Sequence, residues 1–278
     1  MKSEFSPSKQ QLADIAKNVR INVIKAVYHA KGGHIGGPLS AVELLVDLYF
    51  RELKIDPDNP LWDDRDRFVL SKGHSAIALY SVLAERGFFP VSELMTFDAI
   101  DSRMQGHPDM RKTPGIDMSS GSLGQGLSTG VGMALAARRL KKDFRTYVMI
   151  GDGESQEGQI WEAIFVAERY KLDNLVAILD NNKVQQFGWQ HPLALPPIER
   201  AAEKVKAFGW HAIEIDGHNF VEIQNAFNEA REVKGKPTFI IAHTIKGKGL
   251  SFAEGKYTWH ARVPNDDELQ LALKELNG

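Results

Sequence analysis

The sequence contains two apolar runs that each pass directly into a polar cluster: Tyr147-Val-Met-Ile-Gly-Asp-Gly-Glu154 and Leu175-Val-Ala-Ile-Leu-Asp-Asn-Asn182. A short apolar run of this kind is typical of a buried strand. Asp152 and Asn182 are separated by about the length of one strand–helix–strand crossover. We therefore expect two adjacent parallel strands that bring Asp152 and Asn182 close together at their carboxyl ends.

The rest of the chain alternates between strand and helix patterns. Strands are expected at 68–70, 147–150, 175–179, 212–215 and 238–243, and helices at 76–86, 160–171, 197–208 and 220–233. An N-terminal helix follows a capping box at 8–11 and ends at Gly32–Gly33, and a second helix follows Pro38. Residues 55–67 and 102–123 have the composition of loops. The pattern predicts an α/β fold with three α/β/α layers around a mainly parallel sheet, formed by one domain over 1–278.

Composition excludes several classes of protein. The 278 residues include no cysteine, so disulfides, thiolate metal sites and a cysteine nucleophile are excluded. The net charge of −2 gives no basic excess for nucleic acid. The uncharged stretch 118–137 is rich in glycine and serine, which disfavours a membrane span, and the first residues do not form a signal peptide. We expect a soluble, cytoplasmic protein that binds a small molecule.

The two strand-end clusters contain the types of residue that bind a metal ion together with a phosphate group. Carboxylate and carboxamide oxygens, as on Asp152 and Asn182, are ligands that Mg²⁺ accepts together with phosphate oxygens. Gly153 lets a phosphate approach the backbone, and the helix that follows offers free N–H groups. The alternative is that each cluster is only a strand-end turn, which Gly, Asp and Asn form routinely.

Three other motifs fail in their context. Residues 126–130 match the GxSxG nucleophile elbow, but the expected preceding strand is replaced by a glycine- and serine-rich loop. The Rossmann fingerprint fails because Gln156 stands where its third glycine is required. No P-loop motif is present.

The GDG at 151–153, followed about thirty residues later by the NN at 181–182, resembles the thiamine diphosphate signature. The resemblance extends over nearly the whole chain, and within the thiamine diphosphate-dependent enzymes it is to the transketolase family. The sequence of residues 151–161 is most similar to transketolases encoded as two polypeptides. Ile35 and Ser122 stand where the family has proline, which changes loop stiffness more than chemistry. The motifs that carry the resemblance besides the first two are Gly32-Gly-His-Ile-Gly-Gly-Pro38, Ser71-Lys-Gly-His74, Gly106-His-Pro108, Gly121-Ser-Leu-Gly-Gln-Gly126 and Thr244-Ile-Lys-Gly-Lys-Gly249.

The resemblance implies a thiamine diphosphate-binding fold and a role for each matching residue. The expected ligands of Mg²⁺, for which Ca²⁺ or Mn²⁺ could substitute, are Asp152, Asn182 and the carbonyl of Val184. The expected cofactor-binding residues are His74, Gly121, Ser122, Leu123, Gly153, Asn182, Lys246 and His260. The expected catalytic residues, facing the sugar, are His34, His107 and His260. Glu157 and Glu162 would link two active sites across a dimer, and His191, His211 and His218 are given structural roles only.

The resemblance also implies the reaction and what the chain lacks. A transketolase moves a two-carbon ketol unit from a ketose phosphate to an aldose phosphate, such as the sugars of the pentose phosphate pathway. The family's pyrimidine-binding domain supplies a glutamate that activates the cofactor, and both this domain and the C-terminal domain are missing here. We therefore expect the diphosphate-binding subunit of a split transketolase, inactive without a C-terminal partner subunit, in a heterotetramer.

Three alternatives stay open at this stage. The first is a split transketolase for another ketose, such as an apulose or sulfosugar phosphate. The second is a two-chain thiamine-dependent 2-oxo-acid decarboxylase. The third is a catalytically inactive scaffolding subunit.

Overall fold

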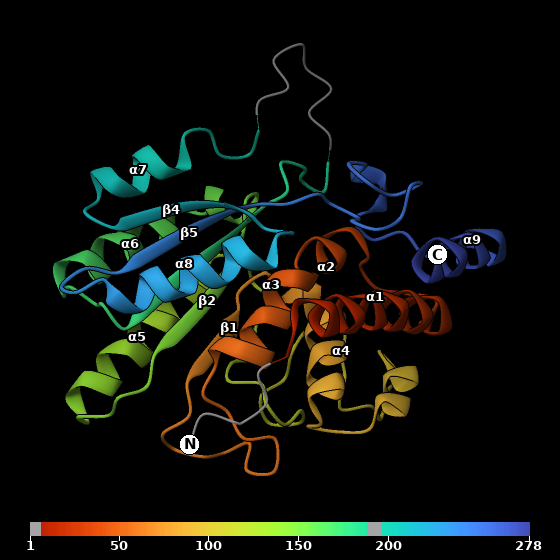
Figure 1. Ribbon diagram of the computed structural model, residues 1–278, viewed down its shortest axis with the longest axis horizontal. Helices are drawn as coiled ribbons and strands as arrows, with labels where there is room; N and C mark the ends of the chain where they lie inside the picture. The colour runs from red at the N-terminus through yellow and green to blue at the C-terminus, as the bar shows by residue number, and fades with distance from the viewer. Residues whose placement is uncertain (1–6, 188–195) are drawn as a thin grey trace.

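The central element is a parallel sheet. The computed structural model describes residues 7–187 and 196–278, and within them it contains five parallel strands in the order β1-β2-β3-β5-β4 (Figure 1). The predicted α/β fold is therefore confirmed. The bounds of the strands are β1 Arg67–Leu70, β2 Thr146–Gly151, β3 Leu175–Asn181, β4 His211–Asp216 and β5 Thr238–His243.

The register of the two central strands brings the polar clusters together. Strand β2 pairs with β3 from Thr146 opposite Leu175 to Gly151 opposite Asp180. Asp152 and Asn182 therefore follow neighbouring strands at the same edge, as the sequence predicts.

Side chains alternate between the two faces of the sheet, so each face forms its own core. Tyr147 and Met149 pack on one side with helices α1 (Lys9–Ala30), α3 (Val42–Asp47), α4 (Ala76–Arg86) and α8 (Phe220–Glu232). Val148 and Ile150 pack on the other side with α5 (Gln125–Arg139), α6 (Gly158–Arg169) and α7 (Ala201–Ala207). Both cores are buried, which gives the three layers expected for a parallel sheet.

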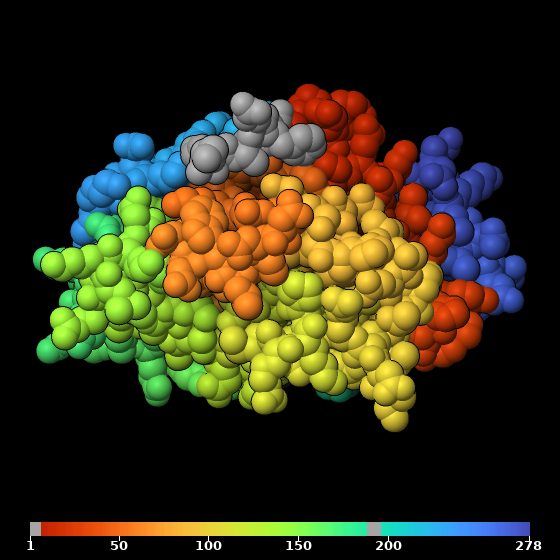
Figure 2. Space-filling model, turned by 90° about the horizontal axis from the view of Figure 1, so that it is seen from below, coloured from red at the N-terminus to blue at the C-terminus, as the bar shows by residue number. Residues whose placement is uncertain are grey.

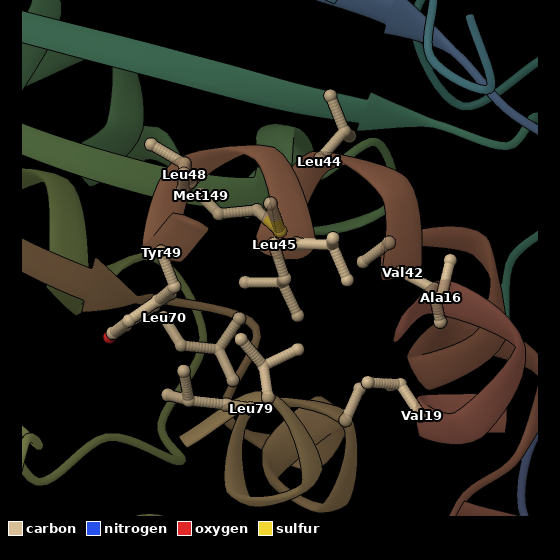
Figure 3. Close-up of a cluster of buried hydrophobic side chains, with 14 of the residues drawn as sticks. Ala16, Val19, Val42, Leu44, Leu45, Leu48, Tyr49, Leu70, Leu79 and Met149 are labelled. Carbon is tan, nitrogen blue, oxygen red and sulfur yellow. The ribbon is translucent and has the colours of Figure 1, made fainter. Parts of the chain in front are cut away.

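The core beneath α3 is shown in Figure 3. Leu45 from α3, Leu79 from α4 and Leu70 from β1 point into the same space, and each is at most 2% exposed. Burial of a leucine side chain contributes about 1.5–3 kcal/mol, so this apolar contact fixes α3 and α4 against the sheet.

The shorter elements connect these layers. They comprise α2 (Gly36–Ser40), η1 (Leu48–Glu52), η2 (Gly73–Ser75), η3 (Val91–Thr96), η4 (Glu154–Gln156), η5 (Tyr257–Trp259) and α9 (Asp266–Asn277). The predicted loops, 55–67 and 102–123, are irregular except for Arg67, which begins β1, and they form much of the lower face of the molecule (Figure 2). Among the described residues, no helix has the length and apolar character needed to cross a bilayer.

Some helix predictions were wrong. Helix α5 was not predicted, because its glycines and serines disfavour a helix in isolation and only packing on the sheet stabilises it. Helix α9 was missed although Asn265 and Glu268 form a capping box at its start. Helix α7 begins at Ala201 rather than at Pro197, and the predicted helix after Pro38 is divided into α2, α3 and the π-helical turn η1.

Two glycines of α5 give a matched test of this packing. A Cβ at Gly130 would lie 2.3 Å from Cγ2 of Val148, whereas a Cβ at Gly132 would meet nothing within 4 Å. We expect Gly130→Ala to lower the free energy of unfolding by about 1–3 kcal/mol through overpacking. We expect Gly132→Ala to raise it by up to about 1 kcal/mol, because alanine favours the helix. Urea unfolding measures the free energy of unfolding of each variant. If the two substitutions changed it by the same amount, the packing of α5 on the sheet would be contradicted.

Candidate active site

A cavity of about 560 Å³ opens at the carboxyl edge of the sheet. Asp152 and Gly153 reach it from the end of β2, Asn182 from the end of β3, and Lys246 from the loop after β5. Two predicted site residues, Ser122 and Glu162, do not line it. The predicted residues that do line the cavity are His34, His74, His107, Gly121, Leu123, Asp152, Gly153, Glu157, Asn182, Val184, Lys246 and His260.

The expected metal ligands gather at one end of this cavity. The Asp152 carboxylate accepts hydrogen bonds from the backbone N–H groups of Gly153, at 2.7 Å, and of Lys183. The Oδ1 atom of Asn182 accepts from the N–H of Val184 at 3.1 Å. Burial, together with the nearby charge of Asp180, raises the pKa of Asp152 to about 6. A bound cation would remove this electrostatic cost.

The donor set fits a hard cation. Within the described residues, no group of three or more His, Asp or Glu side chains could hold a metal. Asp152, Asn182 and the Val184 carbonyl provide instead one carboxylate, one carboxamide and one backbone oxygen. Mg²⁺ is bound by few protein oxygens and completes its shell with phosphate and water.

Four histidines from separate parts of the chain surround the cavity. The ring centroids of His34, His74 and His260 lie 5.1–5.2 Å from one another, and that of His107 lies 6.4 Å from His34. Burial and the charge of Lys246 are among the causes that lower the pKa of His34 to about 4 and that of His260 to about 3. Burial also lowers the pKa of His74. These three imidazoles are therefore neutral near pH 7 and can both donate and accept hydrogen bonds.

Lys246 connects the histidines to the expected metal ligands. Its ammonium donates hydrogen bonds to the carbonyls of Val184, at 2.9 Å, and Gln185, at 3.3 Å, and it lies 2.9 Å from Nδ1 of His260. Burial and the charge of Lys72 lower the pKa of Lys246 to about 8. This amine is largely protonated near pH 7 and is suited to a phosphate group.

Glu154 holds the glycine-rich loop beside the cavity, a role that the sequence did not indicate. Its buried carboxylate accepts hydrogen bonds from Ser71 Oγ and from the N–H groups of Gly124, at 2.8 Å, and Gly151, at 3.0 Å. The loop at 121–124 is thereby fixed to the end of β2. The position of Glu154 directly after the GDG motif indicated that it lies near the site, but the sequence did not show which groups it binds.

A buried ion pair at the wall of the cavity, which Lys72 lines, was also missed. Lys72 and Asp180 are 1% and 0% exposed and form a salt bridge. Lys72 also donates to the Gly37 carbonyl at 2.9 Å, and Asp180 accepts from Ser40 Oγ, at 2.6 Å, and from Thr244 Oγ1. Burial alone would raise the pKa of Asp180, but Lys72 and these donors hold it below its ordinary value. The pair joins the ends of β1, β3 and β5 to α2.

Four other predicted residues, of which Glu157 also lines the cavity, lie on the surface or outside the described residues. Glu157 lies at the start of α6, and both Glu157 and Glu162 are exposed. His211 forms a surface pair with Glu229 at 2.6 Å, and His191 lies outside the described residues.

A parallel α/β sheet with carboxylate, carboxamide and carbonyl oxygens and a histidine cluster at its carboxyl edge is typical of a cofactor-binding α/β protein. The family described as "transketolase, thiamine diphosphate binding domain" matches residues 11–277, and the chain belongs to this family. It is 49% identical over 244 residues to a 6-deoxy-6-sulfo-D-fructose transketolase subunit of Clostridium sp. (strain MSTE9), covering 88% of each chain. It is 41% identical over 274 residues to an apulose-4-phosphate transketolase subunit of Actinobacillus succinogenes, covering 98% of each chain.

Longer relatives match over part of their length. The chain is 42% identical over 281 residues to human transketolase, covering 99% of this chain but 44% of that protein. A crystal structure of transketolase from Campylobacter jejuni superposes with a TM-score of 0.90 at 31% identity, over 98% of this chain and 43% of that one. The chain thus spans nearly the whole of the two subunits but less than half of these two transketolases.

Proposed function

We propose that this chain is the diphosphate-binding subunit of a two-chain transketolase that transfers a two-carbon ketol unit between sugar phosphates. The observation that carries the proposal is the cluster of His34, His74 and His260, with centroids 5.1–5.2 Å apart, beside the oxygen ligands of a thiamine diphosphate-binding domain. Neutral imidazoles suit a substrate with several hydroxyl groups, because each ring can donate one hydrogen bond and accept another.

In this proposal the cavity holds thiamine diphosphate and Mg²⁺. Asp152, Asn182 and the Val184 carbonyl would hold the metal. When bound, the cofactor supplies a carbon nucleophile and an electron sink for cleavage of the bond beside the ketose carbonyl. The residues that would hold the diphosphate and thiazolium side are His74, Gly121, Ser122, Leu123, Gly153, Asn182, Lys246 and His260.

The histidines would handle the protons of the sugar. His34, His107 and His260 are proposed to orient the hydroxyl groups and to accept and return protons there. Because the pKa values of His34 and His260 lie near 4 and 3, both rings are neutral at neutral pH and keep a nitrogen lone pair that can accept a hydrogen bond from a sugar hydroxyl.

A partner subunit would complete the site. The carboxylates that line the cavity within the described residues are Asp152, Glu154 and Glu157. Asp152 is proposed as a metal ligand, and Glu154 is occupied by Ser71 and two backbone N–H groups. Glu157 lies on the exposed start of α6. A second chain is therefore proposed to supply the acid that activates the cofactor. The two chains would form a heterotetramer, in which Glu157 and Glu162 would link one active site to the other.

The names of two relatives favour a second candidate for the substrate. One is named for 6-deoxy-6-sulfo-D-fructose and the other for apulose 4-phosphate. As the second candidate, we propose that the substrate is a sulfonated ketose or apulose 4-phosphate rather than xylulose 5-phosphate. The residues that recognise the distal anionic group would lie on the partner.

The assay uses the chain together with its partner subunit, Mg²⁺ and thiamine diphosphate. We expect ketol transfer from at least one ketose in a panel of xylulose 5-phosphate, apulose 4-phosphate and 6-deoxy-6-sulfofructose. Decarboxylation of 2-oxo acids without ketol transfer would identify the decarboxylase alternative. Absence of both activities, with no cofactor binding by the complex, would support the scaffolding alternative.

A further inference from the structure

Two side chains that do not line the cavity, His218 and Arg20, form hydrogen bonds with the backbone of the loop that carries Lys246. The backbone N–H of Ile245 donates a hydrogen bond to Nε2 of His218 at 2.9 Å. Nε of Arg20 donates to the carbonyl of Lys248 at 3.0 Å. The two anchored peptide groups flank Lys246, so they fix the backbone from which its ammonium extends into the cavity.

A buried carboxylate joins these two anchors. Glu43 on α3 lies 2.8 Å from the Arg20 guanidinium and 2.9 Å from Nδ1 of His218. Arg20 and Glu43 are 6% and 8% exposed. Burial would raise the pKa of Glu43, but Arg20 and His218 lower it to about 2. Glu43 is therefore a permanent anion that fixes both of its partners.

The contacts of His218 also define its tautomer. Nε2 faces a peptide N–H and must accept, so the proton of the neutral ring lies on Nδ1 and is donated to Glu43. A ring fixed in this way transmits the position of α3 to the loop after β5. His218 was given only a structural role from the sequence.

We propose that Arg20, Glu43 and His218 form a clamp that positions Lys246 for the diphosphate of the cofactor. None of the three lines the cavity, so they act through the loop and are positioning residues. The proposal deepens the proposed function and rests on it for the contact between Lys246 and the diphosphate. The attachment of the loop by His218 rests on the hydrogen bonds alone.

Three variants test the clamp. His218→Leu removes both hydrogen bonds, and His218→Gln retains an acceptor that can reach the Ile245 N–H. His211→Leu is the matched control, because the pair of His211 and Glu229 lies on the surface away from the cavity. Hydrogen exchange of the Ile245 amide and the ¹⁵N shifts of His218 are measured in the chain. The Kd of thiamine diphosphate with Mg²⁺ and the kcat at saturating cofactor are measured with the partner subunit present.

We expect His218→Leu to speed exchange at Ile245 about tenfold or more and to raise the Kd of the cofactor about tenfold, the change expected for the loss of one hydrogen bond. The kcat at saturating cofactor is expected to change by less than about threefold, because the clamp touches no reacting group. His218→Gln should restore most of both losses, and His211→Leu should change neither. The ¹⁵N shifts should show a protonated Nδ1.

Unchanged exchange at Ile245 in His218→Leu, or an unchanged Kd despite faster exchange, overturns the clamp. A protonated Nε2 in the wild-type chain also overturns it. A wild-type complex that binds no thiamine diphosphate contradicts the proposed function instead. In that case the exchange and ¹⁵N results still decide whether His218 holds the loop.

Discussion

Replacing Asp152 by asparagine is expected to weaken Mg²⁺-dependent binding of thiamine diphosphate by on the order of 10³-fold, because the site loses its one charged metal ligand. The apo chain should lose little stability. The amide removes the repulsion from Asp180 but gives up one of the two accepted backbone hydrogen bonds, so a change below about 2 kcal/mol is expected. Calorimetric titration with the cofactor and thermal unfolding measure the two effects separately.

The pH dependence of the apo chain gives a second measure of Asp152. Its folded pKa of about 6 exceeds the ordinary value of 3.8, so the folded state binds the proton more tightly than the unfolded state. Protonated Asp152 therefore contributes to the free energy of unfolding. This contribution is fully present below about pH 4 and is lost as the pH rises through 6. In Asp152→Asn this loss should disappear.

Asp143→Asn is the control for Asp152→Asn. Asp143 is exposed and precedes the amino end of β2, whereas Asp152 follows its carboxyl end. The control should bind the cofactor as the wild type does. Metal-dependent binding that survives in Asp152→Asn would show that the expected ligand set is wrong.

The second large effect is expected on stability, from the buried pair of Lys72 and Asp180. Lys72→Met leaves the Asp180 carboxylate buried without its cation, which should lower the free energy of unfolding by about 3–5 kcal/mol. Adding Asp180→Asn should recover a substantial part of this loss, because the buried charge is removed. The amide oxygen can accept from one of the two hydroxyl groups, Ser40 or Thr244, and the amide NH2 can donate to the other. Urea unfolding of the single and double variants measures the coupling.

An exposed pair on the same molecule provides the comparison for Lys72→Met. Lys142 and Asp64 form a salt bridge with side chains 35% and 47% exposed. Lys142→Met should cost less than about 1 kcal/mol, as is usual for surface ion pairs. If Lys72→Met costs no more than Lys142→Met, the buried pair does not hold the strand ends together.

The sheet could be predicted because each strand is a local apolar pattern. The runs that end at Asp152 and Asn182 indicated adjacent parallel strands, and the register of β2 and β3 confirms this. Helix α5 could not be predicted, because Gly126 and Gly130 favour it only through close contact with β1 and β2. A Cβ at Gly126 would lie 2.3 Å from Ser71 Oγ, a residue 55 positions away.

The cavity residues could be predicted only as far as their motifs extend. His34, His74 and His260 lie in glycine-rich or loop motifs, and the structure brings them around one cavity. The buried carboxylates that hold the strand ends and the Lys246 loop around the cavity were missed, because Glu43 and Asp180 carry no local sign of the distant side chains that they bind. The single-domain organisation, the cytoplasmic location, the metal and the individual residue roles stay predictions.

The most direct test of the central claim is to add the partner subunit to the isolated chain. With Mg²⁺, thiamine diphosphate, a ketose phosphate donor and an aldose phosphate acceptor, we expect no ketol transfer by the chain alone. Activity should rise with added C-terminal transketolase subunit, purified together with this chain from its source, and should saturate at equal amounts of the two subunits. Turnover by the isolated chain, or no activity at any ratio of the two subunits, would contradict the account.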